Sequence, residues 1–214
     1  MRISLIGAGD IDFHFNKLLG INNKNLNIEI EKIAKSLVRA DVELCVLPDR
    51  GVCFEVCKKY KEFGGKKVIA TVPRDDKEYG IKHLQKYLEE EINGKKVIDD
   101  VINSGDWYKE NMSHILFADK VLMLGTSLGS LGELSFGYYL FKLFKGHKTG
   151  VKINLKKINK YFLAGEKTSF DTIIYSPFIK EKLPFEIEMY IESCGGKVTY
   201  VSTPNQINGN INKL

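Results

Sequence analysis

The stretch Lys120-Val121-Leu122-Met123-Leu124-Gly125-Thr126-Ser127-Leu128-Gly129-Ser130 is the most informative part of this sequence for the fold. Its first half is an apolar run typical of a buried strand, and Gly125 opens a turn of small and hydroxyl residues. The apolar spacing that follows predicts a helix over residues 131–144. A strand, a glycine-rich turn and a helix in this order form the repeating unit of parallel α/β proteins.

The same rhythm recurs along most of the chain, although residues 149–164 are ambiguous. Repeated alternation of strands and helices predicts a Rossmann-like three-layer α/β fold with a mainly parallel sheet. We expect a single domain over residues 1–203 and a polar, frayed tail over 204–214. The other predicted strands cover 2–6, 42–47, 67–72, 97–102, 172–175 and 197–201, and the other helices cover 26–40, 52–63, 80–93, 107–118 and 180–193.

Composition excludes several classes of protein. The 214 residues carry a net charge of +5, with lysines scattered along the chain and no basic cluster or motif, so no specific nucleic-acid partner is expected. No apolar run reaches the roughly 18 residues that a membrane span needs, and no signal-peptide pattern opens the chain. We therefore expect a cytoplasmic protein that has no membrane partner.

The four cysteines predict a reduced compartment rather than a disulfide framework. Cys53 and Cys57 are spaced to share one face of a helix, which makes half of a metal site conceivable. Zinc needs four ligands, and no matching His or Cys pair is evident. We therefore favour packing roles for both cysteines and predict no metal.

The turn from Gly125 to Glu133 is the leading candidate for a binding site. Free N–H groups and the positive end of the dipole at a helix N-terminus favour anions, and small residues let a ligand oxygen approach the backbone. The alternative is a tight strand-to-helix turn with no ligand. The number of small and hydroxyl residues favours phosphate binding, with the phosphate on the amides of Gly129 and Ser130. The predicted ligand contacts of this turn are Gly125, Thr126, Ser127, Gly129 and Ser130.

Other strand ends add weaker candidates. Gly7 and Gly9 could cradle part of a nucleotide, but the third glycine of the dinucleotide fingerprint is missing and residues 10–25 do not predict an immediate helix. Arg50 and Arg74, two of only four arginines, follow predicted strands and could face the same crevice, or form surface ion pairs.

The histidines and the single tryptophan show no motif of their own. We expect surface or hydrogen-bonded core positions for the histidines. Trp107 is expected to pack in the core, although it begins a helix beside the candidate site and base stacking stays open. The histidines are His14, His83, His114 and His147.

The region from Glu110 to Glu133 resembles the signature of the Lonely Guy family and its wider superfamily. That superfamily includes proteins once labelled lysine decarboxylases and the molybdenum cofactor carriers. Ala118-Asp119 and the strand to Leu124 match the family pattern without a gap, and Ser130 stands in place of a threonine. The resemblance covers about residues 1–150. The remaining positions on the pattern are Gly129, Leu131, Glu133 and Leu134.

Two departures from the family pattern bear on function. Glu110 aligns with the family's catalytic arginine, and Gly125-Thr126-Ser127 replaces a Pro-Gly-Gly triplet. Loss of the arginine removes a bidentate anchor. A standard phosphoribohydrolase is therefore doubtful, although Arg50 or Arg74 could supply the missing cation.

The resemblance implies a nucleotide-binding protein with a small phosphorylated ligand and no further cofactor. Three functions stay open. The first is hydrolysis of the N-glycosidic bond of a nucleoside 5'-monophosphate, in which Glu133 would be the catalytic residue and stabilise an oxocarbenium-like sugar. The second is a non-catalytic carrier or sensor of a nucleotide or cofactor. The third is a vestigial site on a protein that acts through its surface. The family also implies a homodimer.

Overall fold

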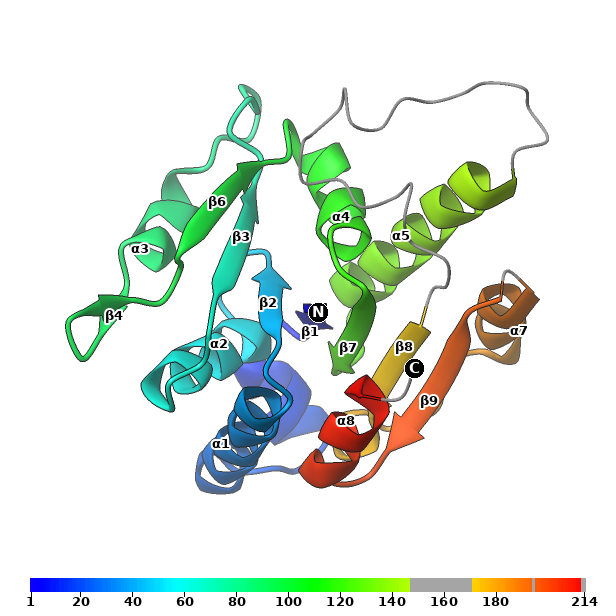
Figure 1. Ribbon diagram of the computed structural model, residues 1–214, viewed down its shortest axis with the longest axis horizontal. Coiled ribbons are helices and arrows are strands. Elements are labelled where there is room, and N and C mark those ends of the chain that lie inside the picture. Colours follow the sequence, from blue (N-terminus) through cyan, green and yellow to red (C-terminus); the bar gives the residue numbers. More distant parts are fainter. Residues whose placement is uncertain (147–170, 194, 213–214) are drawn as a thin grey trace.

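A central parallel sheet organises the computed structural model, which describes residues 1–146, 171–193 and 195–212. The seven-stranded sheet has the order β6-β3-β2-β1-β7-β8-β9, and every pairing in it is parallel. The predicted Rossmann-like three-layer fold is confirmed (Figure 1). In sheet order the strands are β6 (Asp100–Asn103), β3 (Val68–Val72), β2 (Glu43–Val46), β1 (Arg2–Gly7), β7 (Lys120–Leu124), β8 (Asp171–Tyr175) and β9 (Lys197–Val201).

Helices cover both faces of the sheet. Successive residues of a strand point to opposite faces, so each strand contributes side chains to the core under both helical layers. In β1, Leu5 joins the core under one helical layer and Ile6 joins the core under the other. Figure 1 shows the two layers on either side of the sheet. One layer contains α1 (Asn23–Arg39), α2 (Val52–Glu62) and α8 (Pro204–Ile211), and the other contains α4 (Trp107–Leu116), α5 (Leu128–Gly146) and α7 (Phe185–Ser193). None of the helices in the described residues has the length and apolar content that crossing a membrane requires.

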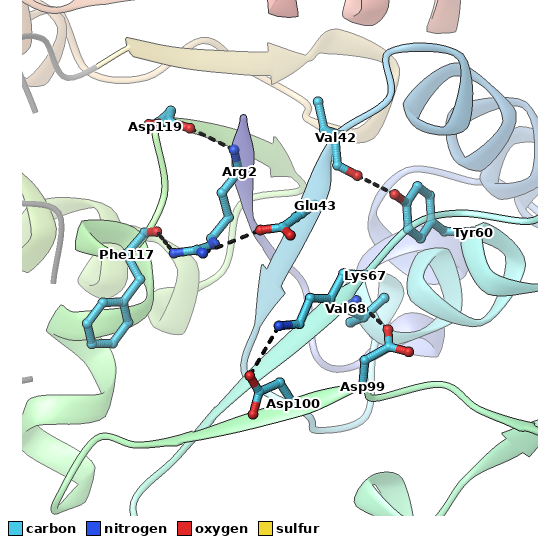
Figure 2. Close-up of polar contacts among 10 residues, drawn as sticks. All are labelled: Arg2, Val42, Glu43, Tyr60, Lys67, Val68, Asp99, Asp100, Phe117 and Asp119. Carbon is cyan, nitrogen blue, oxygen red and sulfur yellow. Dashed lines mark hydrogen bonds and ion pairs between the residues drawn. The ribbon is translucent and has the colours of Figure 1, made fainter. Parts of the chain in front are cut away.

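Polar contacts link the amino ends of the strands (Figure 2). The Arg2 guanidinium donates to the Phe117 carbonyl at 2.8 Å and pairs with Glu43 at 3.3 Å. The Arg2 amide donates to Asp119 at 2.7 Å. These contacts join β1 to β2 and to the start of β7. The opposite edge of the sheet, where the strands end, holds the candidate site.

The predicted helix over residues 80–93 is wrong. The structure has only a 3-10 turn, η2 (Lys82–Leu84), and one helical turn, α3 (Gln85–Leu88), before a hairpin of β4 (Glu91–Ile92) and β5 (Lys95–Lys96). Asn93 and Gly94 connect the two strands with φ of 54° and 71°. Asn-Gly is a strong signal for such a turn. The strand predicted over 97–102 is shorter in the structure and covers Asp100–Asn103.

The chain after Gly9 also differs from the prediction. A π-helix, η1 (Asp12–Leu18), follows directly, where no immediate helix was expected. His14 is buried and its Nε2 lies 2.9 Å from the Phe178 carbonyl, in a second 3-10 turn, η4 (Ser176–Phe178). This contact anchors the loop after β1 to the strand-end region of β8, and it confirms the hydrogen-bonded core position expected for His14.

The polar tail is not frayed. Residues from Pro204 form α8. A capping box between Thr203 and Gln206 stabilises the N-terminus of this helix. Ile207 and Ile211 are fully buried in the core beside α1. These two apolar side chains at helical spacing dock a segment whose other residues are mostly polar, so its composition alone conceals the helix. The ambiguous residues 149–164, together with His147 and Cys194, lie outside the described residues.

Candidate functional site

A cavity of about 340 Å³ opens at the carboxyl edge of the sheet. It lies over the ends of β1 and β2, between the start of α2 and the start of α5. β1 is also where the strand order reverses, with β2, β3 and β6 on one side and β7, β8 and β9 on the other. Open α/β sheets bind ligands at this kind of switch point.

Most of the site residues predicted from sequence line this cavity. Gly125, Thr126 and Arg74 are not among the lining residues. Gly125 has a φ of 119°, and a Cβ there would meet His14 Nε2 at 2.9 Å, so this glycine serves packing of the turn. The predicted residues that line the cavity are Gly7, Gly9, Arg50, Ser127, Gly129, Ser130 and Glu133.

The N-terminus of α5 is partly satisfied by its own side chains. The Ser127 amide donates to Ser130 Oγ at 2.8 Å, and the Ser130 amide donates to Ser127 Oγ at 3.1 Å. The Ser130 amide is therefore engaged within the turn, which corrects its prediction as a phosphate donor. The amides of Leu128 and Gly129 have no acceptor among the described residues, and both residues are exposed. They are the backbone donors that remain at this end of the helix.

Glycines bring the loops after β1 and β2 into close contact. Gly51 begins α2 with a φ of 119°, and a Cβ on it would lie 2.5 Å from the Ala8 carbonyl oxygen. The Val52 amide donates to the same carbonyl at 3.1 Å. A Cβ on Gly7 would lie 2.7 Å from the Leu124 carbonyl oxygen. Both glycines are required by the close approach of neighbouring backbone segments.

Three titratable side chains interact at the cavity, and two of them belong to its lining. His114 Nε2 lies 3.8 Å from Glu133 Oε2, and the two come from α4 and α5. Burial raises the pKa of Glu133 to about 8, and the Glu110 carboxylate adds to the rise. Burial lowers the pKa of His114 to about 4. Both side chains are therefore uncharged at neutral pH.

Glu110 is the third member of this group and does not line the cavity. It is buried and accepts a hydrogen bond from Thr71 on β3. Burial raises its pKa to about 7, against an opposing effect of the Ser104 and Thr71 hydroxyls. The Glu110 carboxyl cannot replace an arginine that anchors a ligand with two hydrogen bonds, because it carries no positive charge.

Nine of the sixteen residues that line the cavity were not among the site residues predicted from sequence, and they include Asp10, Asp49, Cys53 and His114. His114 was expected at the surface or hydrogen-bonded in the core, but it is buried and lines the cavity. Its position four residues after Glu110 places both on one helix face, a signal that could have linked them. Cys53 also lines the cavity, whereas Cys57 is buried in the core. Among the described residues, no group of three or more His, Cys, Asp or Glu side chains is placed to hold a metal ion.

Comparison with solved structures places this architecture among known proteins. The molybdenum cofactor carrier protein of Chlamydomonas reinhardtii aligns over 98% of this chain and 94% of its own, with 15% identity and a TM-score of 0.55. The chain shares the fold of the molybdenum cofactor carriers. A second protein with the carrier fold, the molybdenum cofactor binding protein of the phototrophic bacterium Rippkaea orientalis, gives 14% identity, the same coverage of both chains and a TM-score of 0.55.

The carrier fold extends over nearly the whole chain. A structural-genomics target designated TM1055 aligns over 100% of this chain and 99% of its own, with 13% identity and a TM-score of 0.62. The shared fold therefore continues past residue 150, where the sequence resemblance ended. No protein-family model matches this sequence, and no curated protein matches it by sequence. The fold expected from the resemblance to the superfamily is confirmed.

Proposed function

We propose that this protein binds a small phosphate-bearing ligand, a nucleotide or a related cofactor, in the cavity at the strand-order switch point. The observation that carries the proposal is the pair of unpartnered amides, Leu128 and Gly129, at the start of a long helix beside this cavity. A volume of about 340 Å³ lies within the range of small-molecule sites. Because two neighbours of this fold are carriers or binders of the molybdenum cofactor, that cofactor stands beside nucleotides as a candidate.

Arg50 is the cation that completes the phosphate site in this proposal. It lines the cavity, is exposed, and forms no ion pair within the part of the chain that the structure describes. Arg74, the other arginine considered from sequence, does not line the cavity. A guanidinium at the rim and two free amides give three to four donors for phosphate oxygens.

The protonation of Glu133 favours binding over catalysis. A carboxylate beside a phosphate would repel it, whereas a carboxyl group with a pKa of about 8 is uncharged at neutral pH. Stabilising an oxocarbenium-like sugar requires the ionised carboxylate. We therefore take a non-catalytic carrier or sensor as the first candidate function. Hydrolysis of a nucleotide N-glycosidic bond is the second candidate, because Glu133 does line the cavity.

Thermal unfolding with and without ligands tests the proposal. The panel is inorganic phosphate, AMP and GMP, combined with native mass spectrometry of the protein as purified. A ligand at a hundred times its Kd stabilises the folded state by about 2.7 kcal/mol. Absence of a co-purified small molecule and of any shift would refute ligand binding and favour a surface role.

Chromatography of nucleotide incubations separates the two candidates. A carrier leaves AMP and GMP intact, whereas a hydrolase releases free base. In the second case Glu133→Gln abolishes release without abolishing binding, because the amide keeps the shape of the side chain and loses the charge.

A further inference from the structure

His114 occupies an unusual position for a histidine. Its side chain is 1% exposed, neither ring nitrogen has a hydrogen-bond partner among the described residues, and it lines the candidate cavity. Leaving a buried polar group unpaired costs about 1 to 3 kcal/mol. Because His114 lies at the boundary of a cavity, its unpaired ring nitrogens indicate that a hydrogen-bonding partner enters from the cavity.

Glu133 lies next to His114 but does not satisfy it. The distance of 3.8 Å between Nε2 and Oε2 is too long for a hydrogen bond. Because burial keeps the histidine neutral and the carboxyl protonated, the two side chains together offer both donors and acceptors. They are close enough for one ligand group to contact both.

The surroundings disfavour a charged ligand group at this depth. Glu110 does not line the cavity, but its carboxyl interacts with Glu133 and has a pKa of about 7, so partial ionisation of Glu110 disfavours an anion beside Glu133. Cys53 also lines the cavity and offers no positive charge, because a thiol is either neutral or negative. Gly129 and Arg50 also line the cavity, and the positive charge of Arg50 makes that part of the lining the better place for a phosphate.

We propose that His114 and Glu133 form a polar floor that binds an uncharged group of the ligand, one that both donates and accepts hydrogen bonds. This inference rests on the proposed function and orients the ligand, with the phosphate toward Leu128, Gly129 and Arg50. A sugar hydroxyl and the lactam edge of a heterocyclic ring share the required chemistry. His114 is then a specificity-determining residue.

Isothermal titration of His114→Phe tests the proposal, because phenylalanine keeps the ring and removes both nitrogens. The probes are inorganic phosphate, ribose 5-phosphate, AMP and GMP. Inorganic phosphate is expected to bind the variant as it binds the wild type. If the floor holds a hydroxyl, the affinities for ribose 5-phosphate and both nucleotides fall about ten-fold or more. If it holds a lactam, only the affinity for GMP falls.

Two control variants test whether the loss of affinity comes from the ring nitrogens of His114. His114→Gln retains a donor and an acceptor and is expected to recover part of the lost affinity. His83→Phe changes a histidine that stacks on Trp107 outside the cavity and is expected to alter no affinity. Since His114 forms no hydrogen bond with the described residues, His114→Phe is also expected to unfold no more easily than the wild type.

The outcomes separate this inference from the function on which it rests. Equal affinities of the wild type and His114→Phe for every probe that binds would overturn the polar floor and leave phosphate binding standing. A wild type that binds none of the probes overturns both. Should His114→Phe fail to fold, wild-type affinities in His114→Leu overturn the inference, and a ten-fold loss there supports it.

Discussion

Ser127 and Ser130 cap one another: each side-chain oxygen accepts the amide hydrogen of the other residue, and the two oxygens lie 3.2 Å apart. The Ser130 hydroxyl also donates to the Gly125 carbonyl at 3.2 Å. This arrangement holds the turn after β7 in shape without a ligand. It leaves the amides of Leu128 and Gly129 without an acceptor among the described residues.

Ser130→Ala is expected to lower the free energy of unfolding by about 1 kcal/mol, the usual effect of losing a helix cap. Urea unfolding measures the change. Ser135→Ala, an exposed serine on the same helix, is the matched control and should stay within about 0.5 kcal/mol of the wild type. Equal stabilities of the two variants would contradict a structural role for the cap.

Arg50→Gln is expected to weaken the binding of inorganic phosphate and AMP about ten-fold, since a charge-assisted contact is lost. Stability should not change, because Arg50 is exposed and forms no ion pair within the described residues. Titration at two salt concentrations should also show a weaker salt dependence than in the wild type. Arg74→Gln, outside the cavity, is the control, and a similar loss in that variant would remove Arg50 from the site.

Glu133→Gln is expected to change how stability depends on pH. Burial raises the pKa of Glu133 from 4.5 to about 8, so between these values the unfolded chain has lost a proton that the folded chain keeps. This carboxyl therefore makes the free energy of unfolding fall as pH rises from 4.5 to 8, and the amide cannot contribute to that fall. The variant should gain stability relative to the wild type from pH 5 to pH 8.

Urea unfolding at pH 5, 6.5 and 8 measures this difference. Glu110, with a pKa raised to about 7, acts in the same direction, and His114, with a pKa lowered to about 4, acts oppositely below pH 6.5. Both are present in the wild type and in the variant, so the comparison reports on Glu133 together with its coupling to these two neighbours. The exposed Glu90→Gln serves as the control. A difference that does not grow with pH would show that Glu133 is ionised in the folded protein.

Gly51→Ala is expected to destabilise the protein by roughly 2 to 4 kcal/mol, from a left-handed backbone and overpacking together. A Cβ at this position would lie 2.5 Å from the Ala8 oxygen and 2.6 Å from the Gly9 Cα. Gly209→Ala, in α8 with no atom within 4 Å of the added carbon, should instead stabilise by up to about 1 kcal/mol. Thermal unfolding of both variants measures the contrast.

Much of the fold follows from local patterns. The apolar run before Gly125 and the run from Ile3 to Ile6 predict β7 and β1 because a strand buried on both faces needs apolar residues throughout. The wrong helix over 80–93 arose where an Asn-Gly turn was overlooked. The docking of α8 was missed because two buried isoleucines are too few to stand out from a polar segment.

The sequence by itself determined the alternation of strands and helices, the glycine turns at the strand ends and the candidates Arg50 and Glu133, because these signals lie within a few neighbouring residues. Only the tertiary structure decided that Arg50 rather than Arg74 lines the cavity, that serine side chains occupy part of the α5 N-terminus, and that His114 lies beside Glu133. These relationships join separate elements, and the packing of helices against a common sheet sets them.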